Sequence, residues 1–232
     1  MDLKSGKAPA MKDSSIPTYN ILPKLALKIG FFVLMSLCWL AQASGATQTA
    51  HTIAELQSFI NSANPGDTIL LANGTYLNNS FTIGTNNITV AAATPGGVFL
   101  NGTNAIIISG NYVTFSGFQF TSGSISGIVI EVRGSHNILT QLNFNGYSAQ
   151  KYILLQDGSQ YNEVRFSNFE NKPTSAPAGN LIHVAAHSSI PGYHKIRYSS
   201  FQNMPGVGGD NGNENIRLSN GAQSRSEEHT SE

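Results

Sequence analysis

EVRFSNFEN (163–171) and KIRYSSFQN (195–203) are two copies of one short pattern, in which apolar and polar residues alternate and an asparagine ends the unit. Three earlier segments repeat the pattern more loosely: NITVAAA (87–93), YVTFSGFQF (112–120) and NILTQLNF (137–144). One apolar position recurs through all five segments at intervals of about 24 to 32 residues: Val90, Phe115, Leu139, Phe166 and Tyr198. A unit this short cannot bury its own apolar face, so the period predicts a solenoid of stacked units.

The units are rich in strands and contain no helix-like period. Further strands are expected between them, at AIIIS (105–109), GIVIEV (127–132) and YILLQ (152–156). Two or three strands in each coil predict an all-β fold, a parallel β-helix that runs from Phe81 to about Leu218. An antiparallel sandwich would not need a repeat of this length.

The inward-facing positions follow a fixed order in the later coils: Val164, Phe166 and Phe169 precede Asn171, and Ile196, Tyr198 and Phe201 precede Asn203. Val164 and Phe166 would then share one face of a strand because side chains alternate along it. Asn171 and Asn203 end their units, and stacking would place them in an asparagine ladder.

TIAELQSFINSA (52–63) predicts an amphipathic helix. Thr52 and Glu55 form a T-x-x-E capping box, and Pro65-Gly66-Asp67 ends the segment. The apolar face contains Ile53, Leu56, Phe59, Ile60 and Ala63. We expect this helix to cover the open apolar end of the first coil, since terminal repeats of a solenoid need a cap.

The two ends of the chain have a different character from its body. Lys24 and Lys28 precede an apolar run, 29–40, which is followed by Ala41-Gln42-Ala43. This order predicts a signal peptide with an extended N-region over 1–43. We therefore expect a secreted or periplasmic protein that has no stable membrane anchor after cleavage. The last eight residues, 225–232, resemble the translation of a sequencing adapter. We therefore expect a partial β-helix domain over 44–224, followed by an artefact.

The chain has a formal net charge of zero, which argues against a nucleic-acid binder. The densest polar stretch is GVGGDNGNENIRLSNG (206–221), where a Gly-rich loop returns to a strand and could present Arg217 on the surface. An exposed guanidinium can bind a sugar carboxylate through two hydrogen bonds. The alternative is a coil turn with solvated charges. His183 and His187 have an i, i+4 spacing, but they occupy a strand-like segment without an evident third zinc ligand.

Several of these segments together resemble polysaccharide lyase family six, the alginate lyases and chondroitinase-B-like enzymes. TIAELQSFINSANPGDTILLANGTY (52–76) is similar to the opening of that family, and GGDNGNENIRLSN (208–220) is similar to its G-x-x-G-x-E-x-I-R-x-G stretch, with Ser219 where the family usually has Gly. The similarity extends over roughly 52–221. It implies a right-handed parallel β-helix and assigns Arg217 to the substrate groove.

The resemblance also implies a reaction. In the family, a calcium ion held by one Asn and two Glu residues neutralises the uronate carboxylate, a lysine removes the C5 proton, and an arginine assists departure of the 4-O-linked group. Those residues lie downstream of the Arg217 match. No catalytic residue and no metal ligand is therefore assigned in this chain, and Lys172, Lys195 and Arg197 are not given those roles.

The function expected from the sequence is a secreted lyase that cleaves alginate or a glycosaminoglycan by calcium-assisted β-elimination, truncated before its catalytic centre and inactive as it stands. Two alternatives stay open: a non-catalytic β-helix for glycan binding or adhesion, and another β-helix enzyme such as a pectate lyase or a uronan epimerase. The sequence leaves the oligomeric state open.

Overall fold

The computed structural model describes residues 45–186, 190–204 and 214–219. They belong to one compact unit, Ser44–Glu232. The predicted signal peptide, the adapter-like tail, His187 and most of the Gly-rich loop lie outside the described residues. Among the described residues, no helix is long and apolar enough to cross a membrane.

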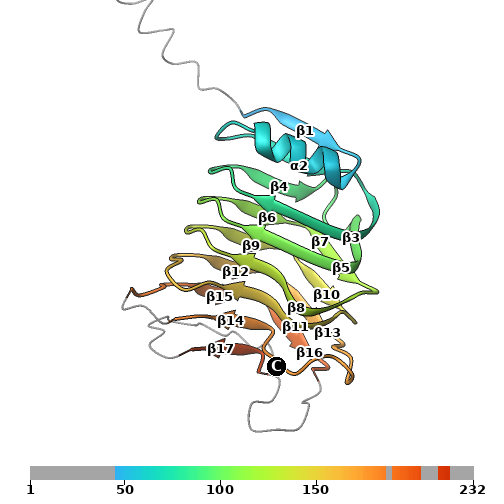
Figure 1. The fold of residues 1–232 in the computed structure, drawn as a ribbon, viewed down its shortest axis with the longest axis vertical. Helices are drawn as coiled ribbons and strands as arrows, with labels where there is room; N and C mark the ends of the chain where they lie inside the picture. The colour runs from blue at the N-terminus through green and yellow to red at the C-terminus, as the bar shows by residue number, and fades with distance from the viewer. Residues whose placement is uncertain (1–44, 187–189, 205–213, 220–232) are drawn as a thin grey trace, which may run out of the picture. The chain divides into compact units, whose positions relative to one another are not determined.

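The described residues form two parallel sheets that wind around a common core (Figure 1). Sheet A contains seven strands, and each strand pairs in parallel with the equivalent strand of the next coil. In spatial order these are β1 (Thr47–Ala50), β2 (Thr68–Leu71), β4 (Thr89–Ala92), β6 (Thr114–Ser116), β9 (Ile138–Thr140), β12 (Glu163–Arg165) and β15 (Lys195–Arg197).

Sheet B contains ten strands and bends around the coil at β5 (Val98–Ile108). The first half of β5 begins one arm, formed by β7 (Phe118–Thr121), β10 (Asn143–Asn145), β13 (Asn168–Glu170) and β16 (Ser200–Gln202). Its second half begins the other arm, formed by β8 (Ser124–Val132), β11 (Ser148–Leu155), β14 (Ile182–Val184) and β17 (Ile216–Leu218). The long strand β3 (Gly74–Ile83) pairs with β5. The predicted all-β parallel β-helix is confirmed.

The repeat segments differ from the prediction in one respect, because each later segment forms two short strands on different sheets rather than one strand. A residue with positive φ separates the two strands: Gly117, Gln141, Phe166 and Tyr198, with φ of 85°, 54°, 49° and 52°. This left-handed conformation turns the chain from sheet A into sheet B.

The predicted apolar position is therefore wrong in the last two coils. In the observed register Val90, Phe115 and Leu139 continue into Val164 and Ile196, all of them buried. Phe166 and Tyr198 lie two residues further on, and each is 53% exposed. Hydrophobicity alone had aligned the wrong aromatic residues, since Phe166 occupies the turn position of Gly117 rather than the core position of Phe115.

Stacked aromatic rings fill the core behind the first arm of sheet B. Phe120, Phe144, Phe169 and Phe201 are register partners, and consecutive ring centroids lie 4.3, 5.4 and 5.0 Å apart. The first three are fully buried. Each coil therefore contributes one ring to a continuous column, which is how a short repeat buries its apolar face on its neighbours.

Polar ladders connect the turns of successive coils. The predicted contact between Asn171 and Asn203 is present, because Asn203 Nδ2 donates to Asn171 Oδ1 at 2.9 Å. A second ladder is buried and was not predicted. Asn137 N donates to Asn162 Oδ1 at 2.9 Å, and Asn162 N donates to His194 Nδ1 at 3.2 Å. Buried backbone groups that have left the sheets thereby keep a hydrogen-bond partner.

Helix α2 (Ile53–Ser62) covers the N-terminal end of the stack, as predicted (Figure 1). Leu56 and Ile60 are buried, and Ile53, Phe59 and Ala63 pack against the core. Thr52 Oγ1 accepts from Glu55 N at 3.1 Å, while Glu55 Oε2 accepts from His51 N at 2.7 Å. The capping box therefore forms, but Glu55 accepts from the backbone N–H of His51 and not from that of the N-cap residue, Thr52.

Candidate functional site

Arg217 lies in the middle of β17, at the C-terminal end of the second arm of sheet B. The backbone of β17 pairs with β14, so that Arg217 is the register partner of His183. Ile216 packs partly against the core, and the alternation of side chains then directs Arg217 to the outer face. Its side chain is 39% exposed. The predicted surface position of Arg217 is thus present.

Four polar side chains accompany Arg217 on and beside these two strands. Arg217 Nη1 lies 3.8 Å from Glu214 Oε2, which is beyond hydrogen-bond distance. Glu214 Oε2 instead accepts from Asn180 Nδ2 at 2.8 Å. His183 Nε2 and Ser219 Oγ form a hydrogen bond. The hydroxyl of Ser219 therefore holds the imidazole next to Arg217.

The environment of Arg217 is clearest by comparison with Arg133, which follows β8 on the same arm. Arg133 Nε and Nη2 donate to the two oxygens of Glu131 at 2.9 and 3.0 Å, so that this guanidinium is occupied by an internal carboxylate. Among the described residues, Arg217 has only a distant ion pair with a half-exposed glutamate, an interaction worth little in water. Of these two arginines, Arg217 is the one that can offer two parallel hydrogen bonds to a ligand carboxylate.

The column of register partners on the outer face that leads to Arg217 contains both apolar and polar residues. Ile107, Glu131, Leu154, His183 and Arg217 are consecutive register partners across β5, β8, β11, β14 and β17. Leu154 is 7% exposed and separates the Glu131 end of the column from the His183 end. The polar group that could bind a sugar acid is therefore confined to β14, β17 and the residues next to them.

The described residues contain no group of three or more His, Cys, Asp or Glu side chains that could hold an ion. None of the described residues is assigned as a calcium ligand. The pair His183 and His187 is not tested, because His187 lies outside the described residues.

Three residues received no catalytic role from the sequence, and they have three different environments: Lys172, Lys195 and Arg197. Lys172 is buried, its ammonium lies 5.9 Å from the ring centroid of Tyr152, and burial lowers its pKa. It borders an open hollow of about 580 Å³ together with Asn171, Asn203 and Met204. Lys195 is exposed in β15, and Arg197 pairs with Glu163. None of them lies on a strand of the Arg217 arm.

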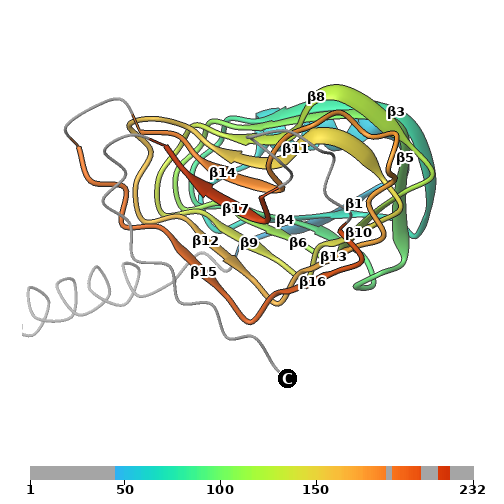
Figure 2. The ribbon, with the colours of Figure 1, turned by 90° about the horizontal axis from the view of Figure 1, so that it is seen from below.

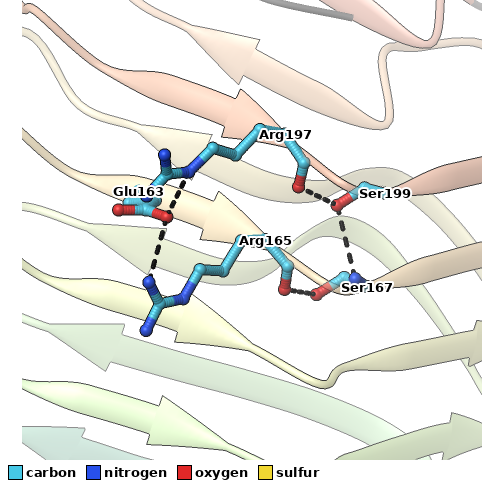
Figure 3. A network of polar contacts seen from close by, with 5 residues as sticks. All are labelled: Glu163, Arg165, Ser167, Arg197 and Ser199. Carbon is cyan, nitrogen blue, oxygen red and sulfur yellow. Dashed lines mark hydrogen bonds and ion pairs between the residues drawn. The ribbon is translucent and has the colours of Figure 1, made fainter. Parts of the chain in front are cut away.

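Sequence reasoning missed a charged network on sheet A (Figure 3). Glu163 Oε1 accepts from Arg197 Nε at 2.7 Å and from Arg165 Nη1 at 3.4 Å. The alternation E-x-R in 163–165 and K-x-R in 195–197, at equivalent positions of two stacked coils, was the signal that could have revealed it.

The fold and the exposed arginine define a parallel β-helix with a surface suited to an anionic ligand. Residues 50–231 match the family model of Chondroitinase B. The match spans well over half of the chain, so the chain belongs to the Chondroitinase B family, and the resemblance to polysaccharide lyase family six is confirmed. The comparison with curated proteins found no match.

Solved structures agree with this fold. The chain is similar to the family-six alginate lyase AlyGC, with 22% identity and a TM-score of 0.65 over 75% of this chain and 26% of that one. It is similar to a mannuronic acid specific family-six lyase from human gut microbiota, with 18% identity and a TM-score of 0.65 over 78% of this chain and 47% of that one. An alginate lyase from a Paenibacillus species gives 21% identity and a TM-score of 0.62 over 78% and 64%. The chain thus spans from about a quarter to just under two thirds of these proteins.

Proposed function

We propose that the chain is the N-terminal part of a secreted polysaccharide lyase that cleaves alginate by β-elimination, and that Arg217 binds a uronate carboxylate of the substrate. The observation that carries the proposal is the position of Arg217 on the outer face of β17, with Glu214 too distant to occupy its guanidinium. Membership of the Chondroitinase B family supports the class of reaction.

The choice of substrate has separate support. One similar structure is an alginate lyase in complex with G6, and another is a family-six alginate lyase in complex with a trisaccharide. The relatives reported above are also alginate or mannuronate lyases. We therefore prefer alginate to a sulfated glycosaminoglycan as the substrate.

The residues around Arg217 suggest how one sugar acid would be held. A carboxylate that approaches the outer face of β17 can accept two hydrogen bonds from the guanidinium and displace the weak ion pair with Glu214. The amide of Asn180 keeps Glu214 in place, and the bond to Ser219 orients the imidazole of His183 beside the same position. These residues bind and orient the substrate.

The chemical step needs more than this. A carbanion next to a carboxylate forms only when a cation masks the carboxylate charge, and calcium supplies that charge in the reaction implied by the family resemblance. The described residues offer no fitting ligand group. We propose that the calcium ligands, the lysine base and the assisting arginine belong to coils that follow Arg217 in the complete protein.

The test is production of unsaturated uronate from alginate, followed by its ultraviolet absorbance. We expect the 232-residue chain to give no product and the complete protein to give product that disappears when calcium is chelated. A complete protein that retains alginate without forming product would instead support the alternative of a non-catalytic glycan-binding β-helix.

A further inference from the structure

A cationic surface lies on the outer face of β12 and β15, on a different sheet from Arg217 (Figures 2 and 3). Arg165 and Arg197 are register partners, as are Glu163 and Lys195. These four residues, which we call the sheet A patch, therefore form a square on two adjacent strands. Figure 2 shows β15 and β17 on different sides of the coil.

The sheet A patch has more positive than negative charge. Its three cations are accompanied by one carboxylate, Glu163, and the same oxygen of Glu163 faces the guanidiniums of Arg165 and Arg197. The contact to Arg165 Nη1 is long, at 3.4 Å, while Arg165 Nε is buried and makes no hydrogen bond to a described residue. The carboxylate therefore satisfies Arg197 better than Arg165, and the partly exposed end of the Arg165 guanidinium can donate to a second anion.

The charge is confined to these two coils. The positions equivalent to Arg165 in the preceding coils are Thr140, Ser116 and Ala91, none of which is charged. A stacking requirement of the solenoid does not explain two arginines here, because the earlier coils form the same sheet without them.

Two exposed aromatic rings flank the guanidiniums. The rings of Phe166 and Tyr198 stack with centroids 5.1 Å apart, and Arg165 and Arg197 lie 5.8 and 5.6 Å from the adjacent ring. The rings occupy turn positions and contribute apolar surface beside the charges. Arginine next to an aromatic edge suits a ligand that combines an anionic group with C–H surface, as an acidic sugar does.

We propose that the sheet A patch is a second binding site for an acidic polysaccharide, separate from the Arg217 site. Adjacent strands lie about 4.8 Å apart, so the side chains of the register partners Arg165 and Arg197 leave the sheet from neighbouring positions along the solenoid. A linear polymer with one acid group per sugar can approach both. The proposal takes only the class of polymer from the proposed function, and binding at this site does not require turnover.

The experiment is affinity electrophoresis of the full 232-residue chain at physiological ionic strength, in gels that contain alginate, chondroitin sulfate or a neutral dextran. We expect retardation by the acidic polymers and none by dextran. The double variant Arg165→Ala/Arg197→Ala should raise the apparent Kd about tenfold, because it removes charge-assisted hydrogen bonds. Alginate carries carboxylates alone, whereas chondroitin sulfate carries both carboxylates and sulfates. Retardation by alginate would therefore show that carboxylates suffice, and retardation by chondroitin sulfate alone would point to the sulfate groups.

Two further variants make the result independent of folding defects. Glu163→Gln removes the internal competitor, so it should strengthen retardation, whereas a purely structural ion pair would lose stability without any gain in binding. Arg133→Ala removes an arginine that Glu131 already occupies, and it should leave retardation unchanged. Melting curves would be recorded for each variant.

The proposal is overturned if Glu163→Gln and the double alanine variant both migrate as the unaltered chain does, or if Arg133→Ala weakens retardation as much as the double variant. It is also overturned if the double variant changes only self-association of the chain, which would make the sheet A patch a contact between two copies. Absence of lyase activity in the complete protein would contradict the proposed function and leave these binding results as they stand.

Discussion

His183 and Arg217 are register partners on adjacent parallel strands, so their side chains leave the second arm of sheet B on the same face. The imidazole is held by Ser219, whereas the one described acidic partner of the guanidinium is Glu214, at 3.8 Å. This difference makes Arg217 the group that can exchange an internal partner for a substrate carboxylate.

Substitution of Arg217 by Ala should weaken substrate binding in the complete protein. Loss of a bidentate guanidinium contact removes a hydrogen-bonded charge pair, and we expect KM for alginate to rise about tenfold or more. Arg217→Lys should recover only part of the loss because an ammonium lacks the planar fork. Initial rates of product absorbance measure this. Arg133→Ala is the matched control, and an equal effect of both substitutions would contradict the role of Arg217.

The corrected register makes a prediction about stability. Phe115 is fully buried, and Phe115→Ala should lower the free energy of unfolding by about 3–5 kcal/mol. Phe166 is half exposed in a turn, and Phe166→Ala should cost about 1 kcal/mol or less. Urea denaturation of the two variants tests the assignment. Similar large losses would mean that Phe166 belongs to the core, as the sequence pattern had predicted.

His194 should make the fold sensitive to acid. Burial lowers its pKa from 6.5 to about 4, with a smaller opposing effect from a backbone hydrogen bond to Ser159. The folded state therefore resists protonation while the unfolded state accepts it. The stabilisation is complete above about pH 6.5 and is lost as the pH falls towards 4, by about 2–3 kcal/mol. Denaturation curves recorded between these pH values measure the slope.

His194→Asn is the control for that slope. An asparagine can continue the ladder from Asn137 and Asn162 by accepting from Asn162 N, but it does not titrate. The variant should unfold with a shallower pH dependence than the unaltered chain. Identical slopes would assign the acid sensitivity to other groups.

Gln57 protects the first coil by pairing with the backbone of Thr82. Its side-chain Nε2 donates to Thr82 O at 3.0 Å, and its Oε1 accepts from Thr82 N at 2.8 Å, so the amide replaces a neighbouring strand. Gln57→Ala should cost about 1–3 kcal/mol and promote association through the freed edge. Thermal melting and light scattering measure both effects. Ser58→Ala, at an exposed position of the same helix, should change neither, and equal scattering from the two variants would argue against edge protection.

The repeat was readable from the sequence because stacking imposes one chemical requirement on every coil. Val90, Phe115 and Leu139 occupy the same buried position, and strand alternation reveals such a position directly. The capping helix was equally clear, since Thr52, Glu55 and the apolar face of α2 are local signals.

The turn between the sheets was not readable in the same way. Gly117 marks it in one coil, but Gln141, Phe166 and Tyr198 adopt the same left-handed conformation without a glycine. Residues of this size seldom have positive φ, so the sequence favoured a continuous strand. The alignment inferred from the sequence was therefore displaced by two residues from the observed register in the last two coils.

The candidate site could be predicted only in part for a related reason. Arg217 was found through a family motif, whereas the network of Glu163, Arg165 and Arg197 depends on the register between β12 and β15. Residues 32 apart in one coil and 25 apart in others meet across strands, as the bonds between Ser200 and Asn168 and between Ser116 and Gln141 show. A variable coil length conceals such neighbours until the strands are paired.

The most direct test of the central claim is the ultraviolet absorbance of unsaturated uronate when the complete protein is mixed with alginate. We predict a rise in absorbance with the unaltered protein and a slower rise with Arg217→Ala at low alginate concentration. No rise at any alginate concentration, from a folded protein supplied with calcium, would contradict the account of this chain as part of an alginate lyase.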